Sequence, residues 1–486
     1  MSKTQSFLED SNTKPIFDKV LEDKIGFGKY QYYLYFFIGF VMIADGSEMT
    51  ALSILLPVLQ TEWGVSSAQQ GALGTALFIG VFLGSICSGL VADRFGRRKT
   101  LMYVSFVQFW FGIFSAFVNS VFLFIIIRGL FGLMIGFTIP IAPTMASELT
   151  PTAFRGKGIA IVNFCFTIGK IYSVIMAKFT LSSLVTGNWR LMLFLSSIPS
   201  LIVSYGAWRY IKESPRYLLV SNRIDEGIEA LDEIGRLNKE TAYSPITEVE
   251  KTAFIQYQQE NFSTQDMYSF KSLWSANYKT ITTCLWVIWY LMQFIEMGII
   301  FILPFIINAI SGETNSTGTK GLNDMIFTVL METPSIFVSL SIIEKEKFGR
   351  KGSIIAMMSL VLTLFILMFI FPLSSFVFLI ALVKLSQKIA YGMLYPLTTE
   401  LYPTTMRIPG FSFSTAFGRL GAATMPSVVL ALFNMGPLMP IFGFGVLAAC
   451  IIFACYMIPY DTRGVDLDKK VKRNSGYELT EKSSGI

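Results

Sequence analysis

Twelve apolar runs, each long enough to cross the hydrocarbon core of a bilayer, constrain this chain of 486 residues more than any other feature. Lipid offers no water to pair with backbone N–H and C=O groups, so each run must close its hydrogen bonds internally as a helix. Only 15% of the residues are charged, and the mean hydropathy is +0.56. We therefore expect an all-α membrane protein with spans near 31–59, 68–92, 100–118, 121–146, 158–183, 190–211, 278–309, 322–343, 352–372, 374–399, 408–433 and 438–459. Prolines inside several spans, such as Pro334, are candidate kink sites.

The loops between the spans differ in positive charge, which predicts the orientation in the membrane. With the N-terminus inside, the inner loops carry 11 Lys and Arg residues, and the outer loops carry only Arg190 and Lys320. Both termini are therefore expected in the cytoplasm. The sequon that begins at Asn315 then falls outside, where glycosylation is sterically possible. The charge pattern does not separate a plasma membrane from a vesicle membrane.

Polar segments divide the chain into five parts. We predict a cytoplasmic tail at 1–30, a six-helix bundle at 31–211, a cytoplasmic linker at 212–277, a second bundle at 278–459 and a cytoplasmic tail at 460–486. Inside the linker, residues 224–237 and 247–260 have the spacing of amphipathic helices. These helices are expected to lie on the cytoplasmic face between the bundles.

Composition excludes several classes of function. The chain has no histidine, so catalytic triads, metal sites and proton relays built on histidine are impossible. The five cysteines lie inside apolar spans without a C-x-x-C pair and are expected to pack as small apolar residues. We found no nucleotide-binding loop, metal cluster or nucleophile constellation, so we expect no enzyme, cofactor or metal. The net charge of +6 follows from cytoplasmic Lys and Arg without a nucleic-acid partner.

Two motifs recur at nearly one offset, which indicates an internal duplication. The segment from Ser147 to Arg155 (SELTPTAFR) matches the segment from Thr399 to Arg407 (TELYPTTMR), 252 residues later. The Gly-Arg-Arg sequence at 96–98 matches Gly-Arg-Lys at 349–351, 253 residues later. Both copies begin inside, so the chain is expected to contain two parallel, pseudo-symmetric six-helix bundles.

These motifs resemble those of the major facilitator superfamily along nearly the whole chain. The segment GLVADRFGRRK (89–99) resembles the family's loop signature, ESPR (213–216) the motif after span 6, and PYDTRG (459–464) the motif after span 12. Segments 45–57 and 395–407 are similar to the branch of synaptic-vesicle-protein-like (SVOP-like) proteins, aromatic-acid and niacin carriers, and organic ion transporters. The resemblance implies alternating access in a functional monomer.

Charged residues at the inner ends of the spans form a candidate cytoplasmic gate. The resemblance implies that opposite charges in this network hold the inner face closed, although the basic residues also serve as topology signals. Gly96 is expected to be required because a side chain would obstruct the tight turn. The second copy of the motif keeps fewer of these residues, so we expect the cytoplasmic gate to be weaker in the second half. The candidate gate residues are Asp93, Arg94, Gly96, Arg97, Arg98, Glu148, Arg155, Glu213, Arg216, Glu346, Arg350, Glu400 and Arg407.

Ionisable residues inside the spans are costly and mark candidate transport sites. Asp45 resembles the span 1 acid of proton-coupled sugar porters, which pairs with a span 4 arginine like Arg128, and this favours proton coupling. Static ion pairs, including Glu332 with Lys384, are the alternative interpretation. The candidate substrate and coupling residues are Asp45, Glu48, Arg128, Lys170, Glu296, Lys388 and Arg419.

Arg419 indicates the class of substrate. Its segment resembles span 11 of organic anion carriers, and a guanidinium fits a carboxylate bidentately. We predict a secondary active transporter of a small organic anion, such as an aromatic or nicotinate-like acid. Aromatic residues of spans 7 and 10, among them Trp286, Trp289, Tyr391 and Tyr395, are candidates for stacking. The alternatives are a sugar or polyol proton symporter, an organic cation transporter, and a non-transporting receptor or scaffold.

Overall fold

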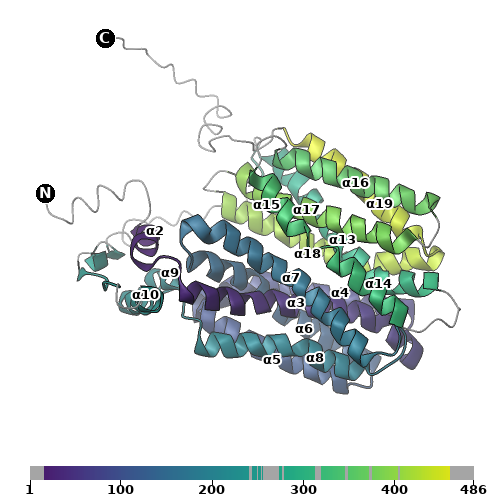
Figure 1. Cartoon of the computed structure of the whole chain (residues 1–486), viewed down its shortest axis with the longest axis horizontal. Coiled ribbons are helices and arrows are strands. Elements are labelled where there is room, and N and C mark those ends of the chain that lie inside the picture. The colour runs from purple at the N-terminus through teal and green to yellow at the C-terminus, as the bar shows by residue number, and fades with distance from the viewer. Residues whose placement is uncertain are drawn as a thin grey trace, which may run out of the picture. The chain divides into compact units, whose positions relative to one another are not determined.

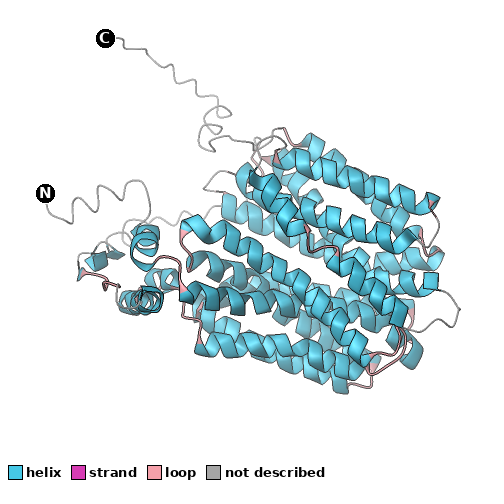
Figure 2. Cartoon of the chain, in the orientation of Figure 1, coloured by secondary structure: helices cyan, strands magenta, loops and turns pink. Residues whose placement is uncertain are grey.

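The computed structural model describes residues 16–239, 243–248, 250–252, 254–255, 273–275, 278–311, 319–344, 349–371, 375–402 and 406–459. Figure 2 shows that these residues form helices joined by loops. Within the described ranges, β-type pairing is limited to an isolated bridge between Leu181 and Gly187. The predicted all-α class is confirmed, and eleven helices in the described part are long and apolar enough to span a membrane.

Six long helices make up the first predicted bundle. The largest packing interfaces join the second helix to the fourth, the first to the fifth, and the third to the sixth. Each helix covers one predicted apolar run, because its backbone can close its hydrogen bonds without water. The helices are α3 (Lys29–Trp63), α4 (Ser67–Phe95), α5 (Arg97–Phe117), α6 (Val121–Glu148), α7 (Thr152–Thr180) and α8 (Trp189–Arg209), labelled in Figure 1.

The second predicted bundle differs from expectation at its second span. The run predicted as one helix at 322–343 is divided into a helix of 12 residues and a helix of 10 residues around a turn at 331–334. Pro334 accounts for the break, because a helical proline clashes with the carbonyl four residues earlier, here Leu330, where the first helix ends. The helices are α13 (Lys279–Ser311), α14 (Thr319–Leu330), α15 (Ser335–Glu344), α16 (Arg350–Ile370), α17 (Phe376–Leu401), α18 (Arg407–Met435) and α19 (Met439–Met457).

The chain forms two compact units. Unit 1 comprises Met1–Asp266, Ile300–Leu330 and Pro426–Leu430. Unit 2 comprises Met267–Ile299, Met331–Met425 and Ala431–Ile486. Every charged cluster described below lies inside one of the units, so each unit is treated by itself.

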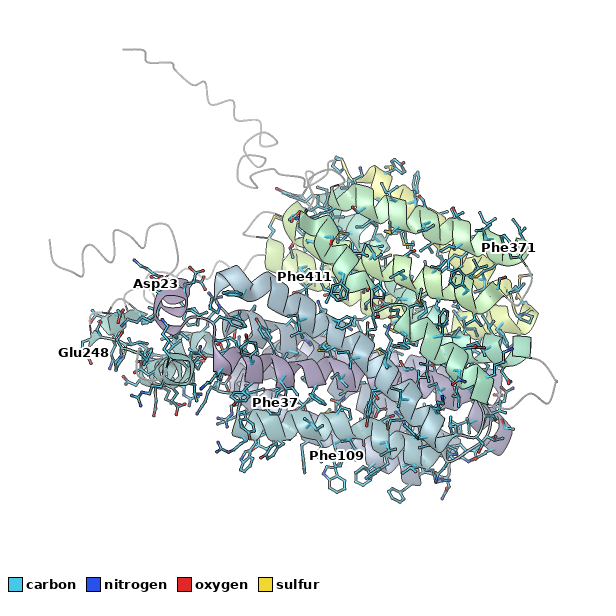
Figure 3. The ribbon with its side chains drawn as sticks, in the orientation of Figure 1. Asp23, Phe37, Phe109, Glu248, Phe371 and Phe411 are labelled. Atoms are coloured by element: carbon cyan, nitrogen blue, oxygen red, sulfur yellow. The ribbon has the colours of Figure 1, made fainter. Side chains whose placement is uncertain are left out.

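A small helical cluster lies at the start of α3, and its packing of linker helices against residues 16–25 was not expected from the sequence. It joins α2 (Ile16–Val20), the short helix η1 (Leu21–Ile25), α9 (Pro215–Val220), α10 (Ile224–Lys239) and the described residues of 243–255, and we call it the linker cluster. Figure 1 shows α2, α9 and α10 together, and Asp23 and Glu248 lie there in Figure 3. Apolar side chains of 17–25 are buried in one core with Leu231 and Ile234 of α10. Residues 16–25 are therefore folded, although we predicted a tail.

Polar contacts fix the linker cluster to the first span. The side-chain amide of Asn238 donates to the Gly26 carbonyl at 3.2 Å and to Oε1 of Gln31 at 2.8 Å, and its oxygen accepts from the Tyr30 N–H at 2.9 Å. Lys24 Nζ lies 2.5 Å from Oε2 of Glu250. The amphipathic helix predicted at 224–237 is confirmed as α10.

Close helix packing in unit 1 depends on glycine. A Cβ at Gly80 or Gly84 of α4 would lie 2.2 Å or 2.1 Å from backbone oxygens of α6. In return, a Cβ at Gly132 or Gly136 of α6 would lie 2.1 Å or 2.3 Å from backbone oxygens of α4. Both pairs have the small-xxx-small spacing that lets membrane helices approach closely.

Candidate functional site

Gly96 forms the tight turn between α4 and α5. Its φ is +96°, and a Cβ there would lie 2.3 Å from Oε2 of Glu213. An L side chain is disfavoured on both counts. The structure thus gives the predicted steric requirement for glycine a specific cause, which is the approach of the Glu213 carboxylate.

Arg97 lies at the centre of an acidic cluster at this end of unit 1. Its guanidinium lies 3.0 Å from Oδ1 of Asp93 and 3.8 Å from Oε2 of Glu148, and it covers the Tyr217 ring at 4.7 Å. Oε2 of Glu148 also accepts a hydrogen bond from the Ser214 hydroxyl at 2.5 Å. The structure therefore brings together predicted gate residues from α4, α5, α6 and the segment before α9.

Arg98 connects the same turn to the end of α8. Its backbone N–H donates to Oε1 of Glu213 at 3.0 Å, and its guanidinium donates to the carbonyls of Ala207 at 2.8 Å and Trp208 at 2.6 Å. Helix ends leave such carbonyls without an intrahelical partner, and a cation stabilises them. Arg216 pairs with Asp18 of α2 at 3.6 Å, and Arg94 contacts the Phe95 ring.

Unit 2 repeats these contacts at the predicted offset. Gly349 also has a positive φ, +64°, and Arg350 lies 3.0 Å from Oε1 of Glu400, as Arg97 approaches Glu148. Lys351 Nζ donates to the Ile458 carbonyl at 2.7 Å at the end of α19, as Arg98 does at the end of α8. The duplication seen in the sequence therefore extends to side-chain contacts. Glu346, Asn315 and the side chains of Arg155 and Arg407 lie outside the described residues.

A cavity of about 310 Å³ lies beside this cluster in unit 1, between the start of α5 and α10. Four cations and four carboxylates line it, and two cross-contacts, Lys212 with Glu233 and Arg223 with Glu226, pair much of the charge internally. A wall of balanced charge selects neither anions nor cations. The cavity is therefore a poor candidate for the substrate site. Its charged residues are Arg98, Lys99, Lys212, Glu213, Arg223, Glu226, Glu229 and Glu233.

Arg128 in α6 has a different partner from the one predicted. Its Nη1 lies 3.0 Å from Oε2 of Glu48 in α3, and both side chains have 0% exposure. The guanidinium also lies over the Phe124 ring at 5.1 Å. We expected Asp45 in this role, but Glu48 lies three residues further along α3, nearly one helical turn, and it is the acid that meets α6.

Asp45 and Lys170 are buried at a close approach between α3 and α7. A Cβ at the neighbouring Gly46 would lie 2.2 Å from the Phe166 carbonyl and 3.4 Å from the Lys170 backbone nitrogen. A Cβ at Gly169 of α7 would likewise lie 2.2 Å from the Ile43 carbonyl oxygen of α3. Two of the candidate transport residues, Asp45 and Lys170, therefore lie at one level of the α3–α7 pair.

Unit 2 contains two ion pairs that differ in exposure. Lys384 lies 2.8 Å from Glu332 at the break between α14 and α15, with the side chains 5% and 2% exposed. Lys388, one turn along α17, lies 3.3 Å from Glu296 of α13, with the side chains 21% and 11% exposed. The first pair is buried and short, and the second is longer and partly accessible.

Arg419 in α18 is partly buried and forms no ion pair or hydrogen bond with the residues that the structure describes. Its neighbour Gly418 packs against α13, where a Cβ would lie 3.4 Å from Trp289 and 3.6 Å from Cβ of Gln293. In the interior of unit 2, two carboxylates thus match two lysines, and the Arg419 guanidinium is the additional cation of this set.

Four aromatic rings form a cluster around Trp289, which packs against Gly418, the neighbour of this arginine. Trp289 contacts Tyr391, Tyr395 and Phe411 with ring centroids 5.6, 5.0 and 6.0 Å apart, all edge to face. Phe411 is labelled in Figure 3. Trp286, the other tryptophan predicted here, stacks on Phe417 at 4.1 Å instead.

Gln293 is a site residue that sequence reasoning missed. Its Oε1 accepts a hydrogen bond from the hydroxyl of Tyr391 across α13 and α17. The available signal was spacing, because Gln293 lies four residues after Trp289 and three before Glu296, so all three share one helix face.

The long apolar helices and the duplicated charge clusters are those of a multi-pass helical membrane protein, and comparison with known proteins identifies its family. The profile of the family described as "Sugar (and other) transporter" matches residues 25–471. The chain belongs to this family of the major facilitator superfamily.

Relatives named as transporters match most of the chain. It is 28% identical to "Putative transporter svop-1" of Caenorhabditis elegans (94% of this chain, 87% of the relative) and 25% to "Organic cation/carnitine transporter 7" of Arabidopsis thaliana (96% and 98%). It is 24% identical to "Niacin transporter NiaP" of Acinetobacter baylyi (84% and 88%). The inward-open, partially occluded xylose transporter XylE from E. coli shares the fold, with a TM-score of 0.70 at 16% identity over 90% of this chain and 99% of that one.

Proposed function

We propose that this transporter carries a small organic anion, with an aromatic or nicotinate-like monocarboxylate as the substrate class. Arg419 carries the proposal, because it is a cation inside a span without a carboxylate partner among the described residues. A charge at that depth is costly unless it is compensated, and a bound carboxylate compensates it. The aromatic cluster around Trp289, which packs against the adjacent Gly418, supports an aromatic substrate.

The names of the relatives suggest two candidate substrates of opposite charge, an organic anion and an organic cation. One is named as a niacin transporter and another as an organic cation and carnitine transporter. The surplus cation of unit 2 favours the first, because a cationic substrate beside Arg419 would be repelled. An organic cation therefore remains the second candidate, and a sugar remains the third because of the family description.

Proton coupling through Asp45 belongs to the same proposal. Asp45 is buried in α3 close to the level of Lys170. A carboxylate in such a place binds and releases a proton when its surroundings change between conformations. Asp45→Asn should transport without accumulation, so uptake by this variant that still concentrates substrate and still follows the pH gradient would contradict the coupling role.

Purified full-length protein in liposomes provides the main test. Uptake of nicotinate, benzoate, tetraethylammonium and xylose is measured with and without an imposed pH gradient. The proposal expects the two acids to be taken up, with accumulation only under the gradient. Saturable uptake of tetraethylammonium or xylose, with no competition by either acid, would replace it with the corresponding alternative.

A further inference from the structure

The side-chain amide of Gln293 joins α13 to α17 in unit 2 and uses only its oxygen to do so. Its Oε1 accepts a hydrogen bond from the Tyr391 hydroxyl. Its side-chain nitrogen makes no hydrogen bond within the part of the chain that the structure describes, although the residue is only 9% exposed. A buried amide donor without a partner costs free energy, and an acceptor on a ligand recovers that cost.

The polar groups near Gln293 differ in whether the protein itself satisfies them. The indole N–H of Trp289 donates to Oγ1 of Thr398 at 2.9 Å, so that tryptophan needs no further partner. Among the described residues of this cluster, the groups left for a ligand are the Gln293 amide nitrogen, the Tyr395 hydroxyl and the Arg419 guanidinium. All of them can donate a hydrogen bond. A ligand that satisfies them must carry acceptors at more than one place.

These groups lie together where α18 packs against α13 and α17. A Cβ at Gly418, the residue before Arg419, would lie 3.6 Å from Cβ of Gln293. The Tyr391 hydroxyl, which bonds to the Gln293 amide, also lies within reach of the charge of Arg419. The hydroxyl of Tyr395 does so as well. A small acid bound to Arg419 through its carboxylate therefore has the Gln293 amide among its nearest polar groups.

We propose that Gln293 is a specificity-determining residue that donates a hydrogen bond from its amide nitrogen to a neutral acceptor in the ring of the substrate. A pyridine-type nitrogen is such an acceptor, because its lone pair lies in the plane of a flat ring and it is uncharged at neutral pH. The Tyr391 hydroxyl holds the amide oxygen, so the nitrogen is the atom left for the ligand. The substrate class narrows from aromatic acids to acids with a ring nitrogen. The inference rests on the proposed function, because it assumes that Arg419 receives the carboxylate.

The test compares benzoate, picolinate, nicotinate and isonicotinate by calorimetric titration of the full-length protein at neutral pH. Each pyridine acid replaces one ring C–H of benzoate by nitrogen, at a different distance from the carboxylate. The isomer whose nitrogen meets the Gln293 amide should bind about three- to tenfold more tightly than benzoate. Isomers whose nitrogen misses the amide should bind more weakly than benzoate, because that nitrogen loses its hydrogen bond to water.

Two variants assign the preference to the amide. Gln293→Met keeps an unbranched side chain and removes the donor, so the preferred isomer should lose its advantage over benzoate. Tyr391→Phe removes the hydroxyl that holds the amide and should reduce the advantage in part. The matched control, Gln108→Met, removes a buried glutamine amide of α5 in unit 1 and should keep the wild-type ratio of affinities. An advantage that persists in Gln293→Met would overturn the inference.

The wild-type titrations decide the matter even if the variants do not fold, and they separate the inference from the proposed function. Binding of benzoate without a gain from a nitrogen at any ring position contradicts the role of Gln293 and leaves the proposed function intact. Failure of wild type to bind all four acids rejects both.

Discussion

At the scale of single residues, the charged side chains inside the helices differ in whether a carboxylate partner meets them. Two spans contribute three cations that a carboxylate from outside their own helix meets within 3.3 Å or less: Arg128 of α6 with Glu48, and the two lysines of α17 with Glu332 and Glu296. Each pair limits the cost of placing charge away from water. Arg419 differs, since no such carboxylate meets it within the described residues.

Replacing Arg419 should weaken anion binding without unfolding the protein. Arg419→Gln should lower the affinity for benzoate about tenfold or more, because a charged hydrogen bond contributes about 1.5–3 kcal/mol. Arg419→Lys should recover only part of the affinity, since an ammonium does not bind a carboxylate bidentately. Titration of the purified variants measures both. Lys279→Gln, at an exposed cation that begins α13, is the control and should bind as wild type.

Breaking the Glu48–Arg128 pair should destabilise unit 1. Glu48→Gln leaves a guanidinium with 0% exposure and no counter-charge from Glu48, which should cost about 3–5 kcal/mol. The double variant Glu48→Gln/Arg128→Met should recover much of this loss, because it removes both charges. Thermal unfolding in detergent measures the difference. A single variant as stable as wild type would show that the pair contributes little.

At the scale of helices, the closest contacts depend on glycine, because it has no side chain. The α4–α6 interface brings backbone atoms together through Gly80, Gly84, Gly132 and Gly136. Close approach of this kind replaces the hydrophobic driving force, which is weak between helices in lipid. Pro334 acts within a single span instead. It divides the span into two helices and places Glu332 in the turn between them.

Adding one methyl group to the α4–α6 interface should be costly. Gly132→Ala places a Cβ 2.1 Å from the Leu77 carbonyl oxygen, so the helices must separate, at a cost of about 1–3 kcal/mol. Gly89→Ala in α4 is the matched control, because no atom lies within 4 Å of its Cβ position. Thermal unfolding should show a lower midpoint for the first variant only. Equal midpoints would mean that the interface relaxes at little cost.

The linker cluster should loosen at acidic pH. Burial acts to raise the pKa of Glu250, but hydrogen bonds from Lys24 and Thr247 outweigh it and hold the pKa below its ordinary value. The ion pair therefore stabilises the cluster fully above the unfolded pKa of about 4.3 and is lost as the pH falls through the lower folded value. Hydrogen exchange of residues 16–25, corrected for intrinsic rates, should rise below about pH 4. In Lys24→Met, exchange should already be raised at pH 7, and the acid-dependent rise should be smaller.

At the scale of the molecule, the internal duplication is seen in two kinds of contact, an Arg–Glu pair and a basic residue at a helix end. The pairs Arg97 with Glu148 and Arg350 with Glu400 occupy equivalent positions in units 1 and 2. In each unit, the next basic residue caps the end of the last helix of its bundle.

The orientation of the molecule in the membrane is a prediction that chemical labelling can check. In a variant without native cysteines, a single cysteine at residue 11 or 480 should react with an impermeant maleimide only after the membrane is opened. A cysteine at residue 316 should react in intact cells, because the distribution of 11 and 2 positive charges places that loop outside. Labelling of the termini in intact cells would reverse the topology.

Local and periodic features of the sequence were sufficient for the architecture. Apolar length predicted the helices, since lipid leaves the backbone no other way to satisfy its hydrogen bonds. The repeated motifs predicted a duplicated unit, although the equivalent contacts in the second copy were not expected. Gly96 was identified correctly as a residue whose side chain would obstruct the turn. The sequence indicates only a kink at Pro334, whereas the structure has a complete break of the helix there.

Only the tertiary structure decided which charges and rings meet. The sequence predicted Asp45 as the partner of Arg128, but the packing of α3 on α6 brings Glu48 to it instead. The contacts of Tyr391 with Gln293 and of Lys388 with Glu296 join segments more than 90 residues apart. Such partners depend on the rotation of each helix about its axis, which is set by side-chain packing over its whole length. Composition and spacing determine that a helix has a face of a given chemical character. Packing determines which residues of other helices that face contacts.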